Sequence, residues 1–395
     1  MEITFEKRSK KENTKKKQQN MQRHDWQLLP EEICIHILTK LDYVDRFNAA
    51  SICNRWFKSL SAKNLWRDVT VQFKENRDAR LVLLAKHYGQ YFQNLHIKCY
   101  QRTKKNQENA CNFLDMLLHQ NRSLTITNFK IEFCEENPLF YSGNSFLTVL
   151  KRFFSYPFYN KNKKNDNNAI KTIDLSQFPV AFDDDLLDTI TQNHACSIET
   201  LDIQNKILTG RISAEAVANF VSKATQLNSL RIPYSCFGGI DALKKVPEST
   251  SLKFLSLTFK RADKFFRYLN GDDWNRIRNA IPDLRIELHF DPTYPLQSTF
   301  RIMLPEVPVS SLKLYIQATV NEHINLASMM YKETLCMLEV TSQPNAELDD
   351  AVLRVVKECE RLESIHVKCG MSKSTVNEIL KLKNFQNYTL LSCDE

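Results

Sequence analysis

Between residues 26 and 67, apolar residues recur at the spacing of a helix. Two stripes with intervals of four residues show this spacing: Ile33, Ile37 and Leu41, and then Ile52, Trp56 and Leu60. The Leu-Pro-Glu-Glu segment at 29–32 is typical of a helix start, because proline fits the first turn and carboxylates favour the positive helix end. The pattern predicts three or four short helices. A unit this small cannot bury all of these large apolar groups by itself, so we expect it to contact a neighbour.

From residue 92 onward, a second pattern recurs: an apolar residue, two variable residues, and then Leu-x-Leu or Leu-x-Ile. Ten copies carry it or close variants of it, from Phe92–Leu95–Ile97 to Phe385–Tyr388–Leu390, and a weaker copy combines Asn121 with Leu124 and Ile126. Most copies lie about 23 to 29 residues apart, which is the range of leucine-rich repeats. Side chains alternate along a strand, so each Leu/Ile pair faces one side. One strand and one helix cannot bury that side alone, so we expect an irregular α/β solenoid with parallel strands on the concave face and helices outside.

Helices are expected in the intervals between these copies. Five stretches have helical patterns: 110–119, 184–193, 214–225, 349–360 and 375–382. The longer interval between Ile126 and Ile170 contains an aromatic stretch from Phe140 to Phe154, which predicts an extra helix, and a polar run at 160–168, which predicts a flexible loop and a second candidate binding segment. The predicted order is a basic tail (1–24), a helical unit (25–70) and a repeat domain (71–395) with an insert near 130–169. An ordinary α/β domain is the alternative for the last part.

The helical unit carries a spaced motif of about 45 residues. It runs W-x-L-L-P-E-E-I-x-x-x-I-L-x-x-L-D, then A-A-S-I-C-N-R-W, then L-W. This motif resembles the F-box, with Ser51 standing where many members carry leucine or valine. The resemblance implies contacts to a Skp-type adaptor from Leu29, Pro30, Ile33, Ile37, Leu41, Ile52 and Trp56. For Trp56, the alternative is a place mainly in the core of the box, and for the whole unit it is an ordinary helical hairpin that caps a larger domain.

An F-box followed by degenerate repeats is similar to the F-box/leucine-rich-repeat receptors. Within the wider group, W-R-x-x-T-x-x-F at 66–73 and the segment Tyr88–Lys98 are most similar to F-box only protein 39 and its relatives. The resemblance implies a non-catalytic substrate receptor of an SCF-type (cullin–RING) E3 ubiquitin ligase, which holds an unknown protein substrate for ubiquitination and proteasomal degradation. The ubiquitin-conjugating enzyme, recruited by the RING subunit on the cullin, then performs the chemistry. A non-degradative scaffold for protein–protein interaction is the alternative.

Substrate contacts are expected on the concave face, at the polar positions between the Leu/Ile residues. These positions are His96, Lys98, Thr125, Asp174, Asp202, Gln204, Arg231, Ser256, Arg285, Glu287, Lys313, Glu339, His366 and Lys368. Their charges are mixed in sign. For any one of them, the alternative is an ordinary solvated strand position.

Composition and charge narrow the possible partners. Hydrophobic residues make up 43% of the chain and charged residues 25%, as in a globular protein, and no apolar run is long enough for a membrane span. Half of the formal charge of +8 lies in residues 1–20, which carry seven Lys/Arg against three Glu. We therefore expect no nucleic-acid-binding fold. The tail is interpreted as a nuclear-import or anionic-surface patch, or as a solvated tail, or as a nucleic-acid-targeting segment, and the expected location is the cytoplasm, the nucleus or both.

No catalytic, cofactor or metal motif stands out. With seven glycines in the chain, no Gly-rich phosphate loop or nucleophile elbow is visible, so we expect no cofactor. The eleven cysteines contain no Cys-x-x-Cys pair and are expected to be reduced thiols. The acidic run 183–185 is interpreted as a helix start, with a metal site as the alternative. His96 and His366 occupy the same repeat position and are expected to lie far apart, so a shared metal is not predicted.

Overall fold

The computed structural model describes residues 28–120, 124–135, 143–156, 169–205, 211–237, 251–261, 263 and 267–392. The chain divides into two compact units. The helical unit comprises residues up to Val69 together with Tyr91–Asn94, and the repeat unit comprises Thr70–Gln90 and the chain from Leu95 onward. The basic tail 1–24 and the polar run 160–168 lie outside the described residues.

Among its described residues, the helical unit contains three short helices and a 3-10 turn, in agreement with the prediction. Their bounds are α2 (Glu31–Thr39), α3 (Tyr43–Ala50), α4 (Asn54–Ser59) and η1 (Lys63–Trp66). Helix α2 follows Pro30 and has two glutamates in its first turn, which favours the positive helix end. Helix α3 begins at Asp42, whose side chain accepts a hydrogen bond of 2.8 Å from the backbone N–H of Asp45.

A single arginine connects the parts of this unit. The Nε of Arg46 donates to the carbonyl oxygens of Leu38 and Leu41, both at 2.9 Å, and its Nη1 donates to the carbonyl oxygen of Leu65. The guanidinium also lies 5.6 Å from the ring centre of Trp66, which is fully buried. The last carbonyl groups of a helix receive no hydrogen bond from within the helix. Arg46 donates hydrogen bonds to carbonyl groups at the C-terminal end of α2 and so satisfies them.

The repeat unit is built on parallel strands in sequential order, and the whole sheet has the order β1 to β12. The strands are β1 (Asp68–Phe73), β2 (Asn94–Tyr100), β3 (Asn128–Cys134), β4 (Thr172–Gln177), β5 (Thr200–Asp202), β6 (Ser229–Pro233), β7 (Phe254–Phe259), β8 (Arg285–Phe290), β9 (Val309–Tyr315), β10 (Met337–Thr341), β11 (Ser364–Met371) and β12 (Asn387–Ser392). The pairs from β3 to β12 are parallel throughout, for example Ile173 beside Leu201 and Leu201 beside Leu230.

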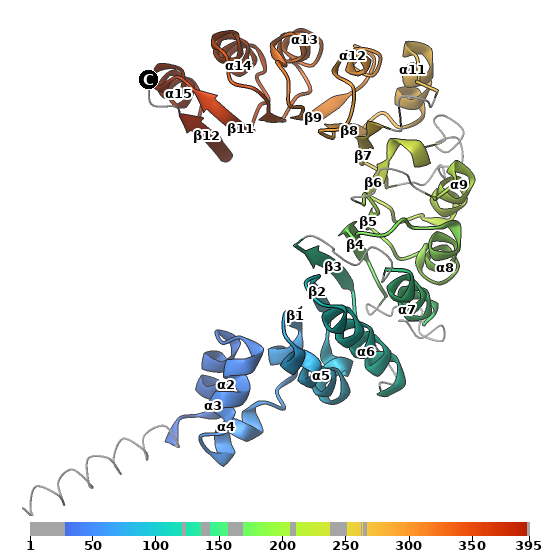
Figure 1. Ribbon diagram of the computed structural model, residues 1–395, viewed down its shortest axis with the longest axis vertical. Coiled ribbons are helices and arrows are strands. Elements are labelled where there is room, and N and C mark those ends of the chain that lie inside the picture. Colours follow the sequence, from blue (N-terminus) through green and yellow to red (C-terminus); the bar gives the residue numbers. More distant parts are fainter. Residues whose placement is uncertain are drawn as a thin grey trace, which may run out of the picture. The chain divides into compact units, whose positions relative to one another are not determined.

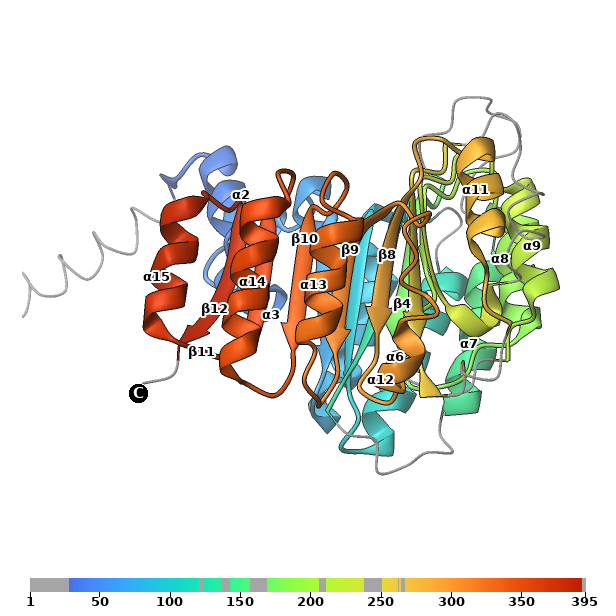
Figure 2. The ribbon, with the colours of Figure 1, turned by 90° about the horizontal axis from the view of Figure 1, so that it is seen from above.

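Helices follow the strands and cover one face of the sheet in the repeat unit, while the other face is open (Figures 1 and 2). They are η2 (Asn76–Arg80), α5 (Leu81–Tyr88), η3 (Gly89–Tyr91), α6 (Lys104–Gln120), α7 (Gly143–Ser155), α8 (Asp184–His194), α9 (Ala214–Lys223), η5 (Tyr234–Cys236), α11 (Gly271–Ala280), α12 (Leu296–Thr299), α13 (Asn321–Met330), α14 (Ala346–Glu358) and α15 (Lys373–Leu382). The five predicted helices are present as α6, α8, α9, α14 and α15. None of the helices in the described ranges combines the length and apolarity that crossing a bilayer requires.

The predicted extra helix is α7, and it brings an aromatic core with it. Phe153 lies 4.9 Å from Phe129 of β3 between ring centres, and Phe146 lies 5.2 Å from Phe133 of the same strand. Aromatic pairs at such distances add to the stability from burial alone. The first part of the predicted aromatic stretch, Phe140 and Tyr141, lies outside the described residues.

One of the repeat assignments was wrong in register. The strand of the weak copy begins at Asn128, so Phe129, Ile131 and Phe133 face inward, whereas Leu124 and Ile126 are buried but precede it. Thr125 therefore lies before the strand and donates to the carbonyl oxygen of Gln90. The aromatic strand has no Leu-x-Leu, which is why the pattern was placed too early. In the last copy the register is as predicted, with Tyr388 beside Ile365 and Leu390 beside Val367, but Tyr388 is 54% exposed because β12 is the terminal strand of the sheet.

The inward leucines should dominate the stability of the repeat unit. We expect Leu338→Ala, at a fully buried position of β10, to lower the free energy of unfolding by about 2–5 kcal/mol, because it leaves a cavity between two strands. The matched control is Leu83→Ala in α5, where the side chain is 56% exposed and the expected loss is under about 0.5 kcal/mol. Urea unfolding followed by circular dichroism measures both. Equal losses would contradict the assigned core.

Candidate functional site

The helical unit presents an unusually apolar surface for so few residues. Six large apolar side chains are between 40% and 69% exposed: Leu28, Ile33, Val44, Phe47, Ile52 and Phe57. In the same unit, Cys34, Leu38, Trp56, Leu60, Leu65 and Trp66 are buried and form the core. The indole Nε1 of Trp66 donates to the carbonyl oxygen of Leu60 at 2.6 Å, so the core is fixed by a buried hydrogen bond as well as by packing. We call the six exposed side chains the apolar box surface.

The residues expected to contact an adaptor fall into three groups. Pro30, Ile33 and Ile52 are exposed. Leu29, Ile37 and Leu41 are half-buried. Trp56 is 3% exposed, so its side chain belongs to the core, which was the alternative for this residue.

Sequence reasoning missed four members of the apolar box surface. Leu28, Val44, Phe47 and Phe57 lie outside the two apolar stripes. The available signal was their position beside those stripes, because a large apolar residue off the buried face of a helix has no core to enter. Phe57, which directly follows the buried Trp56, is the clearest case at 63% exposed.

The open face of the sheet carries polar side chains in rows, because neighbouring strands are in register and side chains alternate. A first row follows the paired positions Lys130, Asp174, Asp202, Arg231, Ser256, Glu287 and Ser311. A second row, two residues further along the strands, follows Thr258, His289, Lys313, Glu339, His366 and Thr389. Register therefore brings together residues that are far apart in the sequence.

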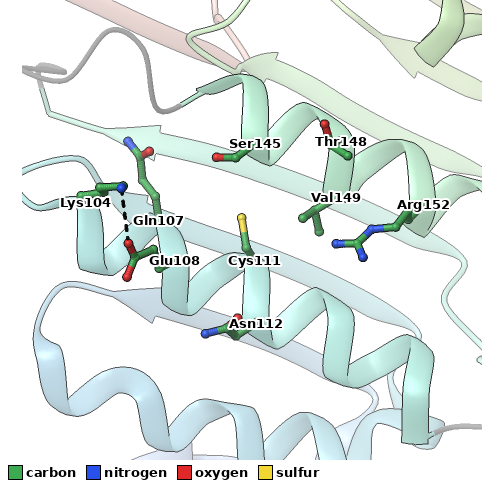
Figure 3. A pocket seen from close by; sticks show the side chains of 9 residues that line it. All are labelled: Lys104, Gln107, Glu108, Cys111, Asn112, Ser145, Thr148, Val149 and Arg152. Atoms are coloured by element: carbon green, nitrogen blue, oxygen red, sulfur yellow. Dashed lines mark ion pairs between the residues drawn. The ribbon is translucent and has the colours of Figure 1, made fainter.

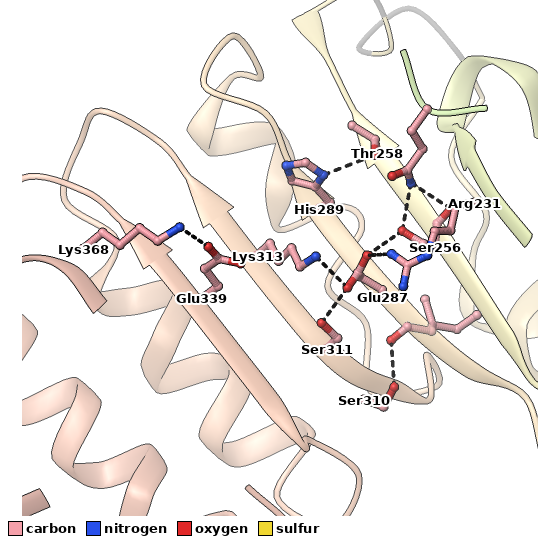
Figure 4. Close-up of polar contacts among 12 residues, drawn as sticks. Arg231, Ser256, Thr258, Glu287, His289, Ser310, Ser311, Lys313, Glu339 and Lys368 are labelled. Carbon is pink, nitrogen blue, oxygen red and sulfur yellow. Dashed lines mark hydrogen bonds and ion pairs between the residues drawn. The ribbon is translucent and has the colours of Figure 1, made fainter. Parts of the chain in front are cut away.

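Glu287 is the centre of the first row (Figure 4). Its Oε1 accepts from Arg231 Nη1 at 2.9 Å and from Ser256 Oγ at 2.7 Å. Its Oε2 accepts from Ser311 Oγ at 2.9 Å and lies 3.0 Å from Lys313 Nζ. The carboxylate is only 3% exposed, and burial alone would raise its pKa, but Lys313 and Arg231 outweigh burial and the pKa of Glu287 is lowered. Glu287 is therefore a charged, fully bonded group at the floor of the open face.

The second row contains a smaller network. Lys368 Nζ lies 2.5 Å from Glu339 Oε1 and 5.7 Å from the ring centre of Tyr315. His289 pairs with Thr258 Oγ1 at 3.2 Å (Figure 4). The ring of His289 also lies edge-on to Tyr315, with 4.9 Å between ring centres. Burial and the nearby Lys313 lower the pKa of His289 to about 4, so this imidazole is neutral at physiological pH. His366 pairs with Thr389 Oγ1 at 3.1 Å on the neighbouring strand.

Strands β2 to β5 carry carboxylates together with their partners. Glu132 lies 3.1 Å from His96 Nε2 and 3.6 Å from Lys98 Nζ. Asp174 lies 3.0 Å from Lys130 Nζ. Asp202 sits beside Asp174 in register, and the described side chains provide no ion pair within 4 Å of it. Burial and then Asp174 raise the pKa of Asp202 to about 7, so this carboxyl is half-protonated near neutrality.

The structure thus joins several of the predicted face residues to one another through hydrogen bonds or ion pairs. Gln204 Nε2 donates to Ser256 Oγ at 2.8 Å, next to Glu287, and Arg285 lies two residues before Glu287 on the same face of β8. The sequence prediction missed several partners on the same face: Lys130, Glu132, Thr258, His289, Ser311 and Tyr315. Most of these lie two residues from a predicted position, and alternation along the strand was the signal that could have found them.

Two other features of the repeat unit carry side chains that could support chemistry. A groove of about 430 Å³ lies between α6 and α7 and is lined by Gln107, Cys111 and Arg152 among others (Figure 3). Burial, with Asp115 nearby, raises the pKa of Cys111 to about 12, so the groove offers a thiol and not a thiolate.

The acidic run begins helix α8, as predicted: Asp183 accepts from the N–H of Leu186 at 3.0 Å and binds Lys151 at 2.7 Å. Within the described part of the chain, no cluster of three or more His, Cys, Asp or Glu side chains could hold a metal.

Comparison with known proteins identifies the kind of helical unit. The family model described as F-box-like matches residues 26–72, which include α2 to η1. The chain therefore carries an F-box-like domain, followed by a parallel α/β repeat array. This agrees with the fold class predicted from the sequence.

Particular relatives extend the similarity along nearly the whole chain. Human F-box/LRR-repeat protein 8 is 24% identical over 353 residues, which cover 88% of this chain and 90% of that protein. Mouse F-box/LRR-repeat protein 21 is 21% identical over 379 residues, covering 91% and 80%. Among solved structures, the Rad7 and Elc1 complex of yeast contains a chain with a TM-score of 0.41 and 12% identity, covering 97% of this chain and 98% of that one. The similarity is to F-box/LRR-repeat proteins, and the closer similarity to F-box only protein 39 stays a prediction.

Asp202, which lies beside Asp174 on the open face, should make the free energy of unfolding depend on pH. Because the pKa of Asp202 in the folded state lies above its ordinary value of 3.8, the folded state holds an extra proton between about pH 4 and 7. Its contribution to the free energy of unfolding therefore falls as the pH rises through that window. We expect Asp202→Asn to be more stable than the wild type at pH 8, on the order of 1–3 kcal/mol, and the difference to vanish near pH 4.

The matched control for this prediction is Asp174→Asn on the neighbouring strand. Hydrogen bonds from Ser176 and Lys130 outweigh burial and lower the pKa of Asp174. Its stabilising contribution is therefore present above the ordinary carboxyl pKa and is lost as the pH falls. Asp174→Asn should be less stable than the wild type at pH 8. Urea unfolding between pH 4 and pH 8 measures both variants, and a destabilised Asp202→Asn at pH 8 would contradict the assignment.

Proposed function

We propose that this protein is the substrate-recognition subunit of an SCF-type cullin–RING E3 ubiquitin ligase. The helical unit binds a Skp-type adaptor, and the repeat unit binds a target protein that is ubiquitinated and degraded by the proteasome. The observation that carries the proposal is the apolar box surface on a domain of the F-box-like family. We place this activity in the cytoplasm, the nucleus or both.

The energetics favour a protein partner for the apolar box surface. Fully burying one Leu, Ile, Val or Phe side chain contributes about 1.5–3 kcal/mol. Six such residues within a unit of about forty residues are too many for a surface that meets only water. The surface is also held rigidly, because Trp66 and Arg46 connect the helices beneath it. A rigid apolar surface loses little entropy on binding, which suits a permanent partner.

The chemistry of the side chains supports an adaptor and not an enzyme. Among the described residues, six cysteines have shifted pKa values, and all six values are raised, mainly by burial: Cys34, Cys99, Cys111, Cys236, Cys336 and Cys359. A raised pKa keeps sulfur as the thiol, which is a poor nucleophile. A receptor needs no nucleophile, because a tethered target gains its rate from a high effective concentration near the conjugating enzyme.

The test is affinity purification of the full-length chain from cells. The wild type should bring down a Skp-type adaptor and a cullin. The variant Ile33→Ser with Ile52→Ser should retain at least about a hundredfold less adaptor, because two side chains lose the burial that the interface provides. Both residues are exposed, so the variant should unfold at the same temperature as the wild type.

The chain offers a matched control. Leu83→Ser with Met329→Ser also removes two exposed apolar side chains, but from α5 and α13 of the repeat unit, and should retain the adaptor fully. A wild-type protein that brings down neither adaptor nor cullin would refute the proposal. Equal loss of adaptor in both double variants would show that the box surface is not the contact.

A further inference from the structure

Two basic side chains on the open face of the sheet are held from below by one buried carboxylate. Glu287 of β8 is bonded to Arg231, two strands away on β6, and to Lys313 on the neighbouring β9 (Figure 4). The side chains of Arg231 and Lys313 are 31% and 20% exposed, against 3% for Glu287. Solvent therefore meets the two cations, while the anion that orients them lies underneath.

Arg231 and Lys313 have more N–H donors than Glu287 engages. A guanidinium has five N–H donors and an ammonium three, and Glu287 engages Nη1 of Arg231 and Nζ of Lys313. Arg231 is also held over the ring of Phe254, with Cζ 4.8 Å from the ring centre. The positions of both head groups are thus fixed before any partner arrives, which lowers the entropy that binding costs.

The surrounding charges favour an anionic partner at this part of the face. On β6 to β11 the open face carries Arg231, Arg285, Lys313 and Lys368 against the carboxylates Glu287 and Glu339. His289 is neutral at physiological pH and does not add to this excess. On β2 to β5 the balance is reversed, with Lys98 and Lys130 against Glu132, Asp174 and Asp202.

We propose that the open face of β6 to β11 binds an acidic, carboxylate-rich segment of a target protein, with Arg231 and Lys313 as its central contacts. The proposal rests on the proposed function, because it names the chemistry of the target that the repeat unit holds. A carboxylate pairs with arginine through two parallel hydrogen bonds, which gives direction as well as attraction. The positive excess around the contact also steers an acidic segment toward it and repels a basic one.

The test uses the full-length protein and a fluorescein-labelled deca-glutamate peptide, with binding followed by fluorescence anisotropy. The wild type should bind the peptide, and more weakly as salt increases. Arg231→Gln with Lys313→Gln should bind about tenfold more weakly, because two partly exposed ion pairs are lost. The matched control is Lys171→Gln with Lys357→Gln, which removes the same charge and two ion-paired lysines outside strands β6 to β11 and should bind within about twofold of the wild type.

A further variant keeps the test valid if the double variant fails to fold. Removing both cations leaves Glu287 buried without its ion pairs, which destabilises the sheet. Arg231→Gln, Glu287→Gln and Lys313→Gln together replace the charged group by amides, and this triple variant should also bind about tenfold more weakly. Thermal unfolding of each variant shows whether the fold is retained.

Each remaining outcome decides against the proposal. A wild type that binds no deca-glutamate overturns it, as does an equal loss in the control variant. Binding of a phosphoserine-containing peptide without binding of deca-glutamate would identify a phosphate site instead, and binding of a deca-lysine peptide would reverse the assigned charge. Adaptor retention by the same variants is measured separately and should be unchanged, so a failure here is distinct from a failure of the proposed function.

Discussion

The in-register stacking of parallel strands is the interaction on which the rest of the repeat unit depends. Ile173, Leu201, Leu230 and Leu255 occupy paired positions on four successive strands, so each side chain is buried against its counterpart in the next repeat. No repeat covers its own pair, and stability is therefore a property of neighbours. A slip of one residue would turn every one of these side chains to the open face. The sheet permits a shift between Ile286 and Glu287, where the extra residue on β9 is the small Ser310.

The same register fixes the chemistry of the open face. Once the leucines are aligned, the intervening polar residues are aligned as well, and each must find a partner in the neighbouring strands or remain solvated. Glu287 finds four partners and keeps its charge despite being buried. Asp202 lies beside another carboxylate, Asp174, on one side and beside Arg231 on the other, and burial and then Asp174 raise its pKa to about 7. At Glu287 the partners outweigh burial, whereas at Asp202 the N–H of Gln204 and the nearby Arg231 do not outweigh burial and Asp174.

These dependencies explain what could be predicted from the sequence. The spacing of Leu201 and Ile203, or of Leu338 and Val340, predicts a strand because burial needs only a local alternation. Helix α11 was missed because its ten residues contain a narrow apolar face, with Trp274 and Ile277 buried among charged and polar residues. The pairing of Arg231 with Glu287, 56 residues apart, depends on register, on a long side chain and on the small Ser256 between them. None of these three conditions is visible in a periodic pattern.

In the F-box-like unit, the sequence pattern predicts the helices but not which of their faces is exposed. The two candidate surfaces therefore require different evidence. Periodicity identifies residues that share a helix face, but it does not say which face another helix covers. Trp56 is covered and the adjacent Phe57 is not, although both are large and aromatic.

An apolar surface binds through area and shape, so one family motif can specify one constant partner. The binding proposed for the open face would instead depend on charges held at fixed positions by Glu287, and their direction and sign would then decide between targets. A receptor with a constant partner at one surface and a selected target at the other would need these two kinds of interaction, and the chain keeps them on separate elements.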